Sequence, residues 1–293
     1  MNDRFQDLYL RDVTLQPLLL HSMAHAWEFI EPVMRLVDPQ HICEIGAESG
    51  LTTDLLCRAF PAANVWAVDP YPSRTLDLVN ARYSNSHLVR AYSPEALLEL
   101  PLADIYLVDG DHNYYTVLQE LRTIESLSLA EPAPRQPLVI LHDVGWPCAR
   151  RDFYCDPERV PNDYRQPMVK GAGVVPGKQE AVLSRARGEE IGFRRECWVA
   201  SAEGGSSNGV LTAVEDFLAE REGYEFLRVP VVFGFGFLFP KAAPYAAAVR
   251  AVVKPWAENG FLERLERNRI DLYLRVLELQ DEVERLRALH FRA

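Results

Sequence analysis

Short apolar segments alternate with amphipathic stretches through residues 41–143, and this alternation constrains the fold more than any other feature of the chain. The apolar segments that we expect to be strands are 41–46, 64–69, 87–92, 104–109 and 138–143. Patterns typical of helices lie between them, near 51–59, 74–83, 94–99 and 114–127. Strand, helix and strand repeated at intervals of about 20–30 residues indicate right-handed crossover connections and a parallel sheet.

The segments on either side complete the expected domain. Residues 14–37 carry apolar side chains at steps of three and four, which predicts helix and makes 1–40 an N-terminal helical layer. The apolar runs 225–232 and 235–239 are joined so tightly that they should pair antiparallel. The sequence therefore predicts an α/β, Rossmann-like, doubly wound and mostly parallel sheet over 41–240 that ends in an antiparallel hairpin.

Residues 146–207 interrupt this pattern, because Trp, Pro, Gly, Arg and Tyr follow one another there without a sustained period. We expect this stretch to be a long insertion. An irregular segment of this length inside a compact domain is usually a lid or a binding loop, although disorder is the competing explanation. The insertion is therefore predicted to cover a substrate site.

Residues 241–293 end in a heptad pattern. Apolar and ring-bearing residues alternate by three and four at Leu262, Leu265, Leu272, Val276, Leu279, Val283, Leu286 and His290, with Arg269 at the remaining position. About four heptads favour a coiled coil that joins two copies into a homodimer. The alternative is that this helix packs onto its own domain.

Composition excludes several classes of protein. Lys and Arg number 31 and Asp and Glu 42, and the resulting net charge of −11 repels phosphate backbones, so we expect no nucleic-acid partner. Five cysteines without a C-x-x-C pair indicate a reducing compartment, and the expected location is the cytoplasm. The longest apolar run, 229–239, is far shorter than the roughly 20 residues of a membrane span. We therefore expect no membrane partner either.

The first expected strand runs through Glu44 and Gly46 into Gly50 and then directly into a helical pattern. Glycines at such a turn let a ligand approach the backbone, and the following helix N-terminus favours negative groups. Asp69 ends the second expected strand, where a carboxylate can accept both hydroxyl hydrogens of a ribose in an open α/β sheet. The turn and the acid together predict a nucleoside site.

The order Glu44-x-Gly46, Asp69, Ser93 and Asp109 resembles the class I S-adenosylmethionine-dependent methyltransferases over residues 40–240. The resemblance implies that Gly46 faces the methionine part of the cofactor, Asp69 the ribose, and Ser93 the adenine side. The cofactor contacts expected on this basis are Glu44, Gly46, Ala47, Ser49, Gly50, Thr52, Asp69, Ser93 and Asp109. Many class I enzymes have a third glycine where this chain has Glu48.

Two further segments sharpen the resemblance. The chain here is similar to the metal-dependent small-molecule O-methyltransferases, the group that contains macrocin, sugar and catechol O-methyltransferases. The segments that carry this similarity are Val108-Asp109-Gly110-Asp111-His112 and, further on, Leu141-His142-Asp143. This resemblance implies transfer of a methyl group from S-adenosylmethionine to a hydroxyl of a sugar or a natural-product scaffold. The alternatives are an N- or C-methyltransferase without a metal, and a non-catalytic S-adenosylmethionine-binding assembly module.

Asp109 and Asp143 end two strands that should be neighbours, so their carboxylates are expected at one sheet edge. Two such carboxylates suit Mg²⁺, but the resembling enzymes have a second acid or an Asp-Asn pair where this chain has His142-Asp143. An imidazole ligand favours Mn²⁺ or another nitrogen-accepting ion. The predicted metal ligands are Asp109, His142 and Asp143, and the alternative is that Asp143 caps a loop while His142 bonds to the backbone.

The catalytic residues predicted are Asp109 and His112. His112 can take a proton from a hydroxyl near neutral pH, although it could instead cap the helix that follows. The first part of the insertion combines arginines, which bind carboxylate or phosphate, with aromatic rings that stack on sugars. The substrate contacts predicted there are Trp146, Arg150, Arg151 and Tyr154.

Overall fold

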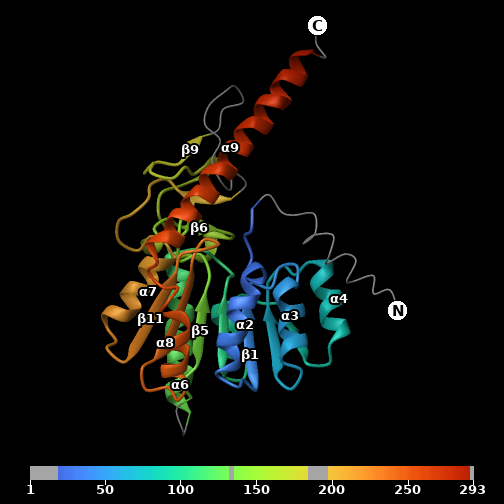
Figure 1. The fold of residues 1–293 in the computed structure, drawn as a ribbon, viewed down its shortest axis with the longest axis vertical. Coiled ribbons are helices and arrows are strands. Elements are labelled where there is room, and N and C mark those ends of the chain that lie inside the picture. Colours follow the sequence, from blue (N-terminus) through green and yellow to red (C-terminus); the bar gives the residue numbers. More distant parts are fainter. Residues whose placement is uncertain (1–18, 132–134, 184–196, 291–293) are drawn as a thin grey trace.

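The computed structural model describes residues 19–131, 135–183 and 197–290 and contains one large sheet (Figure 1). This seven-stranded sheet has the order β11-β12-β5-β4-β1-β2-β3. Its strands are β1 (His41–Ile45), β2 (Asn64–Val68), β3 (Ser86–Val89), β4 (Ile105–Val108), β5 (Leu138–Leu141), β11 (Tyr224–Val229) and β12 (Phe235–Pro240). Strands β1 to β5 pair in parallel, whereas β12 is antiparallel to both β5 and β11. The predicted Rossmann-like sheet with its antiparallel final hairpin is confirmed.

Helices cover both faces of this sheet, so its central strands are buried on both sides. They are α2 (Trp27–Arg35), α3 (Leu51–Ala59), α4 (Arg74–Arg82), α5 (Ser93–Ala96), α6 (Tyr114–Ala130), α7 (Val210–Ala219) and α8 (Ala246–Val253). Along β4, Tyr106 and Val108 belong to the apolar core beneath α6 and α7. Ile105 and Leu107 belong to the core beneath α2, α3 and α8. This burial on both faces explains why β4 and β5 read as uninterrupted apolar runs.

The strand order places a crevice beside β1. Strand β1 pairs with β2 on one side and β4 on the other, so the chain leaves β3 at one edge and returns across β1 to form β4. In open α/β sheets, ligands bind at the carboxyl ends of the strands where the order reverses in this way. The segments that follow β1 and β4 are therefore the first place to look for a site.

The described part of the predicted N-terminal helical layer is helical over residues 23–35. Residues 1–18 lie outside the described part of the chain, and the 3₁₀ turn η1 (Met23–Ala26) leads directly into α2. The Ser22 side chain accepts a hydrogen bond from the Ala24 N–H, while the Ser22 N–H donates to His25 Nδ1. This capping box explains why helical structure begins here. Pro32 lies inside α2 without ending it.

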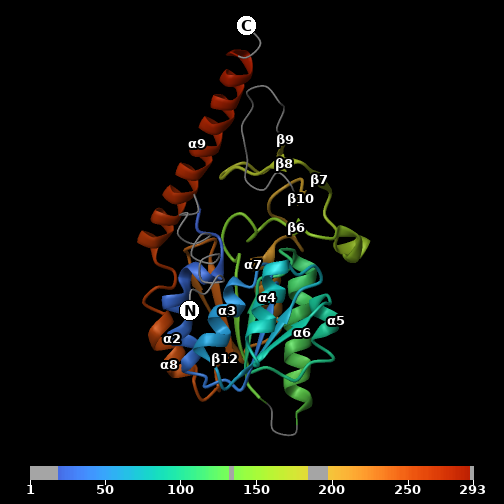
Figure 2. The same ribbon diagram turned by 90° about the vertical axis from the view of Figure 1, so that its right-hand side faces the viewer.

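The insertion has regular structure of its own, which corrects the expectation of an irregular stretch. Its elements are β6 (Phe153–Tyr154), η2 (Pro157–Arg159), η3 (Asn162–Tyr164), β7 (Met168–Lys170), β8 (Ala172–Gly173), β9 (Val182–Leu183) and β10 (Trp198–Ala200). They form a β6-β10-β7 sheet and a β8-β9 pair above one end of the large sheet (Figure 2). Strands of two or three residues are too short to show a period of two, which is why the pattern was not visible in the sequence.

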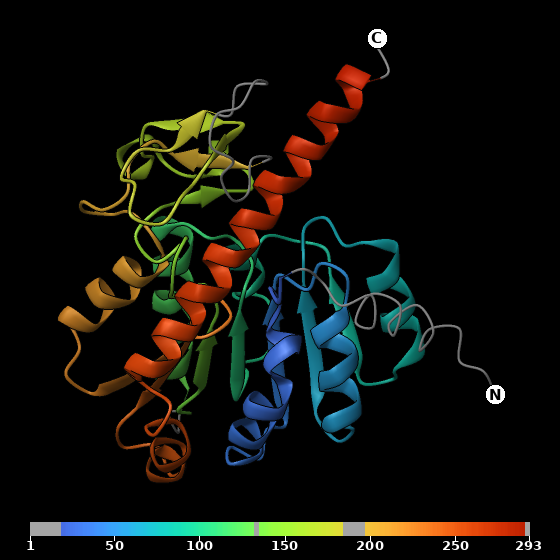
Figure 3. The same ribbon diagram turned by 45° about the horizontal axis from the view of Figure 1, so that its top comes forward.

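The C-terminal helix α9 (Gly260–His290) runs along the domain and then extends beyond it (Figures 1 and 3). It packs on its own domain through Ile270 and Leu274, which are buried and do not belong to the heptad pattern. The large apolar residues of the heptad are between 45% and 60% exposed at Leu265, Leu272, Leu279, Val283 and Leu286. The His290 side chain lies outside the described part. Of the helices described, none is long and apolar enough to cross a membrane.

Candidate functional site

A cavity of 1120 Å³ opens where β1, β2 and β4 end. Its further walls come from the insertion, from Leu19 and His21 ahead of η1, and from Tyr273 and Leu277 of α9. The sequence-predicted residues that line it are Glu44, Gly46, Ala47, Ser49, Thr52, Asp69, Ser93, Asp109 and His112. Pockets for small ligands usually measure about 300–1000 Å³, so this one has room for two molecules side by side.

The turn after β1 is built by close backbone approach. Gly46 has φ +85°, and a Cβ atom added to it would lie 2.2 Å from the Asp109 carbonyl oxygen. Gly50 also has a positive φ and is the N-cap of α3. Because a side chain at position 46 would collide with the segment after β4, the glycine is what lets the two strand ends meet at the cavity.

Asp69 is fixed by two backbone hydrogen bonds. The Glu48 N–H donates to its Oδ2 at 2.8 Å, and the Tyr71 N–H donates to its Oδ1 at 2.7 Å. A carboxylate has about four lone-pair positions, so each oxygen of Asp69 keeps acceptor capacity beyond these bonds. Glu48, which stands where many class I enzymes have glycine, has φ +43° and contributes through its N–H. The turn thus orients the acid that was predicted to meet a ribose.

Two buried glutamates lie behind the cofactor side of the cavity. Glu44 accepts a hydrogen bond from the Thr53 hydroxyl, and Glu120 of α6 accepts one from the Ser93 hydroxyl. Burial raises the pKa of Glu44 to about 8 against the opposing hydrogen bond from Thr53, and the charges of Asp109 and Asp69 raise it further. Burial likewise raises the pKa of Glu120 to about 8. Both carboxyl groups therefore carry a proton near neutral pH.

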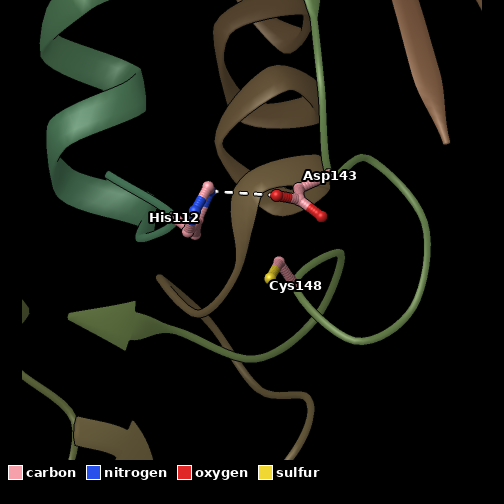
Figure 4. Close-up of side chains that lie close together, drawn as sticks. All are labelled: His112, Asp143 and Cys148. Atoms are coloured by element: carbon pink, nitrogen blue, oxygen red, sulfur yellow. Dashed lines mark ion pairs between the residues drawn. The ribbon is translucent and has the colours of Figure 1, made fainter. Parts of the chain in front are cut away.

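The predicted catalytic and metal residues meet as two His–Asp pairs. His142 Nδ1 lies 3.0 Å from Asp109 Oδ1 and 3.7 Å from Asp143 Oδ2. His112 Nδ1 lies 3.0 Å from Asp143 Oδ2, as the dashed line in Figure 4 marks. Asp109 and His112 line the cavity, whereas His142 and Asp143 are buried behind them. Asp143 has φ +59°, a conformation that suits few residues and is often found at functional sites.

The structure excludes helix capping by His112, whereas the backbone bond of His142 is compatible with both of its predicted roles. Asn113, rather than His112, caps α6, because its side chain accepts a hydrogen bond from the Thr116 N–H. His142 does bond to the backbone, through Nε2 and the Val232 carbonyl oxygen at 2.8 Å. Burial by itself lowers the pKa of His142, but Asp109 and Asp143 together raise it to about 9.

Asp109, His142 and Asp143 together suit a divalent ion that binds nitrogen as well as oxygen ligands. A metal-binding imidazole typically donates its second ring N–H to a carbonyl or a carboxylate, which is the bond that Nε2 of His142 makes with Val232. Its Nδ1 then faces the oxygens of Asp109 and Asp143, and the three ligand atoms lie within 4.8 Å of one another. Cys148 Sγ also lies within 4.8 Å of the ligand atoms of His112 and Asp143 (Figure 4). Nitrogen ligands favour Mn²⁺, Fe²⁺ or Zn²⁺ over Mg²⁺.

The residues predicted to contact substrate do not line the described cavity wall. Arg151 is buried and donates to the backbone carbonyls of Ala200 and Gln179. The Tyr154 hydroxyl donates to Asp152. Arg150 pairs with Glu215 of α7, and Trp146 packs against the apolar core. These side chains hold the insertion together, because the guanidinium N–H groups satisfy carbonyls that such short strands leave unpaired.

Side chains outside the predicted substrate contacts join the insertion to the segments that follow β2 and β3. The Tyr71 and Tyr92 hydroxyls are 2.7 Å apart, and Tyr92 donates to Asp156 of the insertion at 3.0 Å. The Arg159 guanidinium lies 3.7 Å from the centre of the Tyr92 ring and pairs with Glu95. The only feature of the sequence that pointed to these contacts was the polar and aromatic character of the insertion. The contacting residues are up to 64 positions apart, so no local pattern could pair them.

Comparison of the sequence with family models and with curated proteins finds no match. Among solved structures, the chain is similar in fold to the SAH-bound methyltransferase PaMTH1 of Podospora anserina, with 16% identity, a TM-score of 0.44, and coverage of 81% of this chain and 88% of that one. It is also similar to a methyltransferase from Geobacter sulfurreducens, with 12% identity, a TM-score of 0.44, and coverage of 82% and 89%. The cofactor-bound protein Rv0187 from MTB gives 13% identity, a TM-score of 0.48, and coverage of 82% and 91%. These likenesses are ones of fold.

Proposed function

We propose that the protein is an S-adenosylmethionine-dependent methyltransferase that transfers the methyl group to a hydroxyl of a small molecule. The observation that carries the proposal is Asp69. Its carboxylate is oriented by two backbone N–H groups at the carboxyl end of β2, beside the glycine turn of Gly46. A carboxylate in this position of an open α/β sheet is suited to bind the hydroxyls of a ribose. The volume of 1120 Å³ leaves space for an acceptor next to a nucleoside.

The residues of the chain would act mainly by positioning and by moving one proton. When bound, S-adenosylmethionine would supply a methyl carbon that passes from its sulfonium sulfur to the acceptor oxygen as the C–S bond breaks, with S-adenosylhomocysteine as the leaving group. His112 is the general base: with Nδ1–H donated to Asp143, the ring carries its lone pair on Nε2, where it takes the hydroxyl proton. Holding both reactants in one cavity would remove much of the entropic barrier of a two-molecule reaction.

The metal-dependent form of this proposal assigns Asp109, His142 and Asp143 as ligands. A divalent ion held there would lower the pKa of a bound acceptor hydroxyl and stabilise the developing alkoxide. One observation favours the metal-free alternative: each of the two carboxylates already has an imidazole partner at 3.0 Å. Activity that persists after dialysis against a chelator would select this alternative.

The charges of the cavity favour an uncharged or cationic acceptor, such as a sugar or a natural-product scaffold. Besides the protonated Glu44, carboxyl groups line it at Glu48, Asp69, Glu95, Asp109, Asp111 and Asp156. Among the described lining residues, Arg159 is the one arginine, and it already pairs with Glu95. Since Arg150 and Arg151 are engaged elsewhere, the cavity repels an acceptor that carries phosphate or carboxylate groups.

We also propose that α9 pairs with a second copy of the chain. Leu265, Leu272, Leu279 and Leu286 recur every seven residues and are exposed. The part of α9 that carries the last two extends beyond the domain (Figure 2). Leu279→Glu should convert a dimer into a monomer in sedimentation velocity, whereas Leu129→Glu, at an exposed leucine of α6, should leave the dimer intact. A wild-type protein that sediments as a monomer would overturn this assignment.

The function is tested by calorimetry with S-adenosylmethionine. Wild-type protein should bind it, and Asp69→Asn should weaken binding by about 10-fold or more, since one charge-assisted acceptor is lost. The matched control is Asp77→Asn, because Asp77 pairs with Arg90 on the surface of α4, away from the cavity. Absence of binding by the wild type at millimolar ligand would refute the proposal.

A further inference from the structure

The turn that joins β11 to β12 is held in an unusual conformation next to the site. Val232, Phe233 and Gly234 have φ values of +49°, +64° and +90°. The left-handed region suits glycine but is rarely adopted by a β-branched or an aromatic residue. Such a conformation persists only where the surrounding structure holds it. The contacts of this turn are therefore informative.

One peptide group of the turn links His142 to the C-terminal helix. The Val232 carbonyl accepts the hydrogen bond from His142 Nε2 at 2.8 Å. The N–H of the same peptide group belongs to Phe233 and donates to Glu266 Oε1 of α9, also at 2.8 Å. Because a peptide group is planar, fixing the direction of its N–H fixes the direction of its C=O. Glu266 thereby controls where the carbonyl that holds the His142 ring points.

Neighbouring contacts secure both ends of this connection. Arg269 makes two hydrogen bonds to the Glu266 carboxylate, at 2.8 and 2.6 Å, and lies 5.0 Å from the centre of the Phe233 ring. It also donates to the Leu20 carbonyl at 2.8 Å, next to the segment that lines the cavity. On the other side, the Gly145 N–H donates to the Phe233 carbonyl at 2.6 Å. The turn is thus fixed between α9 and the loop after β5.

Glu266 differs from the other acids near the start of α9. Its side chain is 13% exposed, and it bonds to the backbone of the turn as well as to Arg269. Glu263, one turn earlier, is 47% exposed and pairs with Arg228 at 3.0 Å. Neither glutamate lines the cavity described above. Glu263 therefore provides a matched control on the same helix.

We propose that Glu266 is a positioning residue, which locks the Val232–Phe233 peptide so that its carbonyl holds the His142 imidazole against Asp109. The proposal rests on the proposed function only in taking His142 as part of the reactive site. Without the Glu266 carboxylate, the peptide loses the acceptor of its N–H and is free to rotate. The His142 ring then loses the partner of its Nε2–H and, with it, the fixed direction of Nδ1 towards Asp109.

The experiment compares Glu266→Ala, Glu266→Gln and Glu263→Ala in the full-length protein. Glu266→Ala should lower kcat by about 10-fold or more, as is typical when the partner that orients a reactive imidazole is lost, with KM for S-adenosylmethionine nearly unchanged. The Gln variant should recover most of the activity, since its amide oxygen still accepts from the Phe233 N–H. Glu263→Ala should behave like the wild type.

A second measurement does not depend on activity. In protein with ¹⁵N-labelled histidine, the hydrogen-bonded Nε2–H of His142 should give a slowly exchanging NMR signal in the wild type, in Glu266→Gln and in Glu263→Ala. It should be broadened or lost in Glu266→Ala. An unchanged signal or an unchanged kcat in folded Glu266→Ala would overturn the proposal, as would an equal loss in Glu263→Ala. If Glu266→Ala fails to fold, Glu266→Gln alone decides: a lost His142 signal in that folded variant overturns the proposal, and a retained signal supports it.

These outcomes separate the proposal from the assigned reaction. Failure of the wild type to bind S-adenosylmethionine would refute the proposed function, yet the NMR signals would still show whether Glu266 holds His142. Conversely, normal methyl transfer in Glu266→Ala would overturn the positioning role and leave the proposed function intact.

Discussion

The two halves of the cavity are built in different ways. The half that we propose binds the cofactor, called the cofactor half below, comes from strand ends that are close in the sheet. Backbone groups fix its main features: Gly46 lies against the Asp109 backbone, and two N–H groups hold Asp69. The acceptor half is assembled from the insertion, the N-terminal segment and α9, and Arg269 of α9 donates to the Leu20 carbonyl there. The difference suggests a rigid binding half and a half whose shape depends on distant segments.

The largest effect is expected from removing Asp109, the acid that contributes to both halves. Asp109→Ala should reduce turnover by about 10³-fold or more while cofactor affinity falls far less, because His142 and any ion held there lose their partner. Steady-state kinetics and calorimetry on one preparation check this. Turnover near the wild-type level, together with insensitivity to a chelator, would leave only the metal-free mechanism.

A methyl group added at Gly46 tests the rigidity of the cofactor half. Gly46→Ala would place Cβ 2.2 Å from the Asp109 carbonyl oxygen, so we expect a loss of about 3 kcal/mol or more in the free energy of unfolding, and weaker cofactor binding. Gly177→Ala is the control, because φ is also positive there but no atom lies within 4 Å. It should cost only about 1 kcal/mol. Equal losses in urea unfolding would show that the contact at Gly46 is unimportant.

The buried acids of the cofactor half should make stability depend on pH. The folded pKa of Glu120 is raised to about 8, so its contribution is fully present below its ordinary pKa of 4.5 and is lost as pH rises towards 8. The protein should therefore be less stable at pH 8.5 than at pH 5.5. Glu120→Gln should reduce this slope by about 1–3 kcal/mol over that interval, as measured by urea unfolding. A slope identical to that of the wild type would contradict burial of an ionisable group at this position.

The smallest effect is expected where the insertion meets the cofactor side. Asp156→Asn keeps the shape but replaces a charged acceptor of the Tyr92 hydroxyl, so KM for S-adenosylmethionine should rise about threefold with kcat retained. Glu158→Gln is the control, because Glu158 pairs with Arg165 at the exposed surface of the insertion. If both variants match the wild type, the insertion does not help to retain the cofactor.

The same contrast explains what the sequence could predict. Gly46, Asp69 and Asp109 follow directly after strands and Asp143 comes two residues after β5, and the rules of parallel sheets place such residues at one edge. Arg151 could not be read in this way, because the carbonyl groups that it satisfies lie 28 and 49 residues further along the chain. Its charge suggested a substrate contact, whereas burial made it a structural residue.

The heptad pattern of α9 shows a similar limit. The period of seven correctly marked an exposed apolar row, but the contacts with the domain use Ile270 and Leu274 on another face. The role of Glu266 also depends on a strained turn more than 30 residues earlier, which no local pattern marks. A helix pattern thus predicts which residues share a face and leaves open what each face touches.

The structure of the protein with S-adenosylhomocysteine is the most direct test. We expect both ribose hydroxyls within about 3 Å of the Asp69 carboxylate oxygens, with the amino-acid end of the ligand beside Gly46. A ligand that binds with its ribose away from Asp69, or a cavity that stays empty in crystals grown at saturating ligand, would contradict the assigned activity.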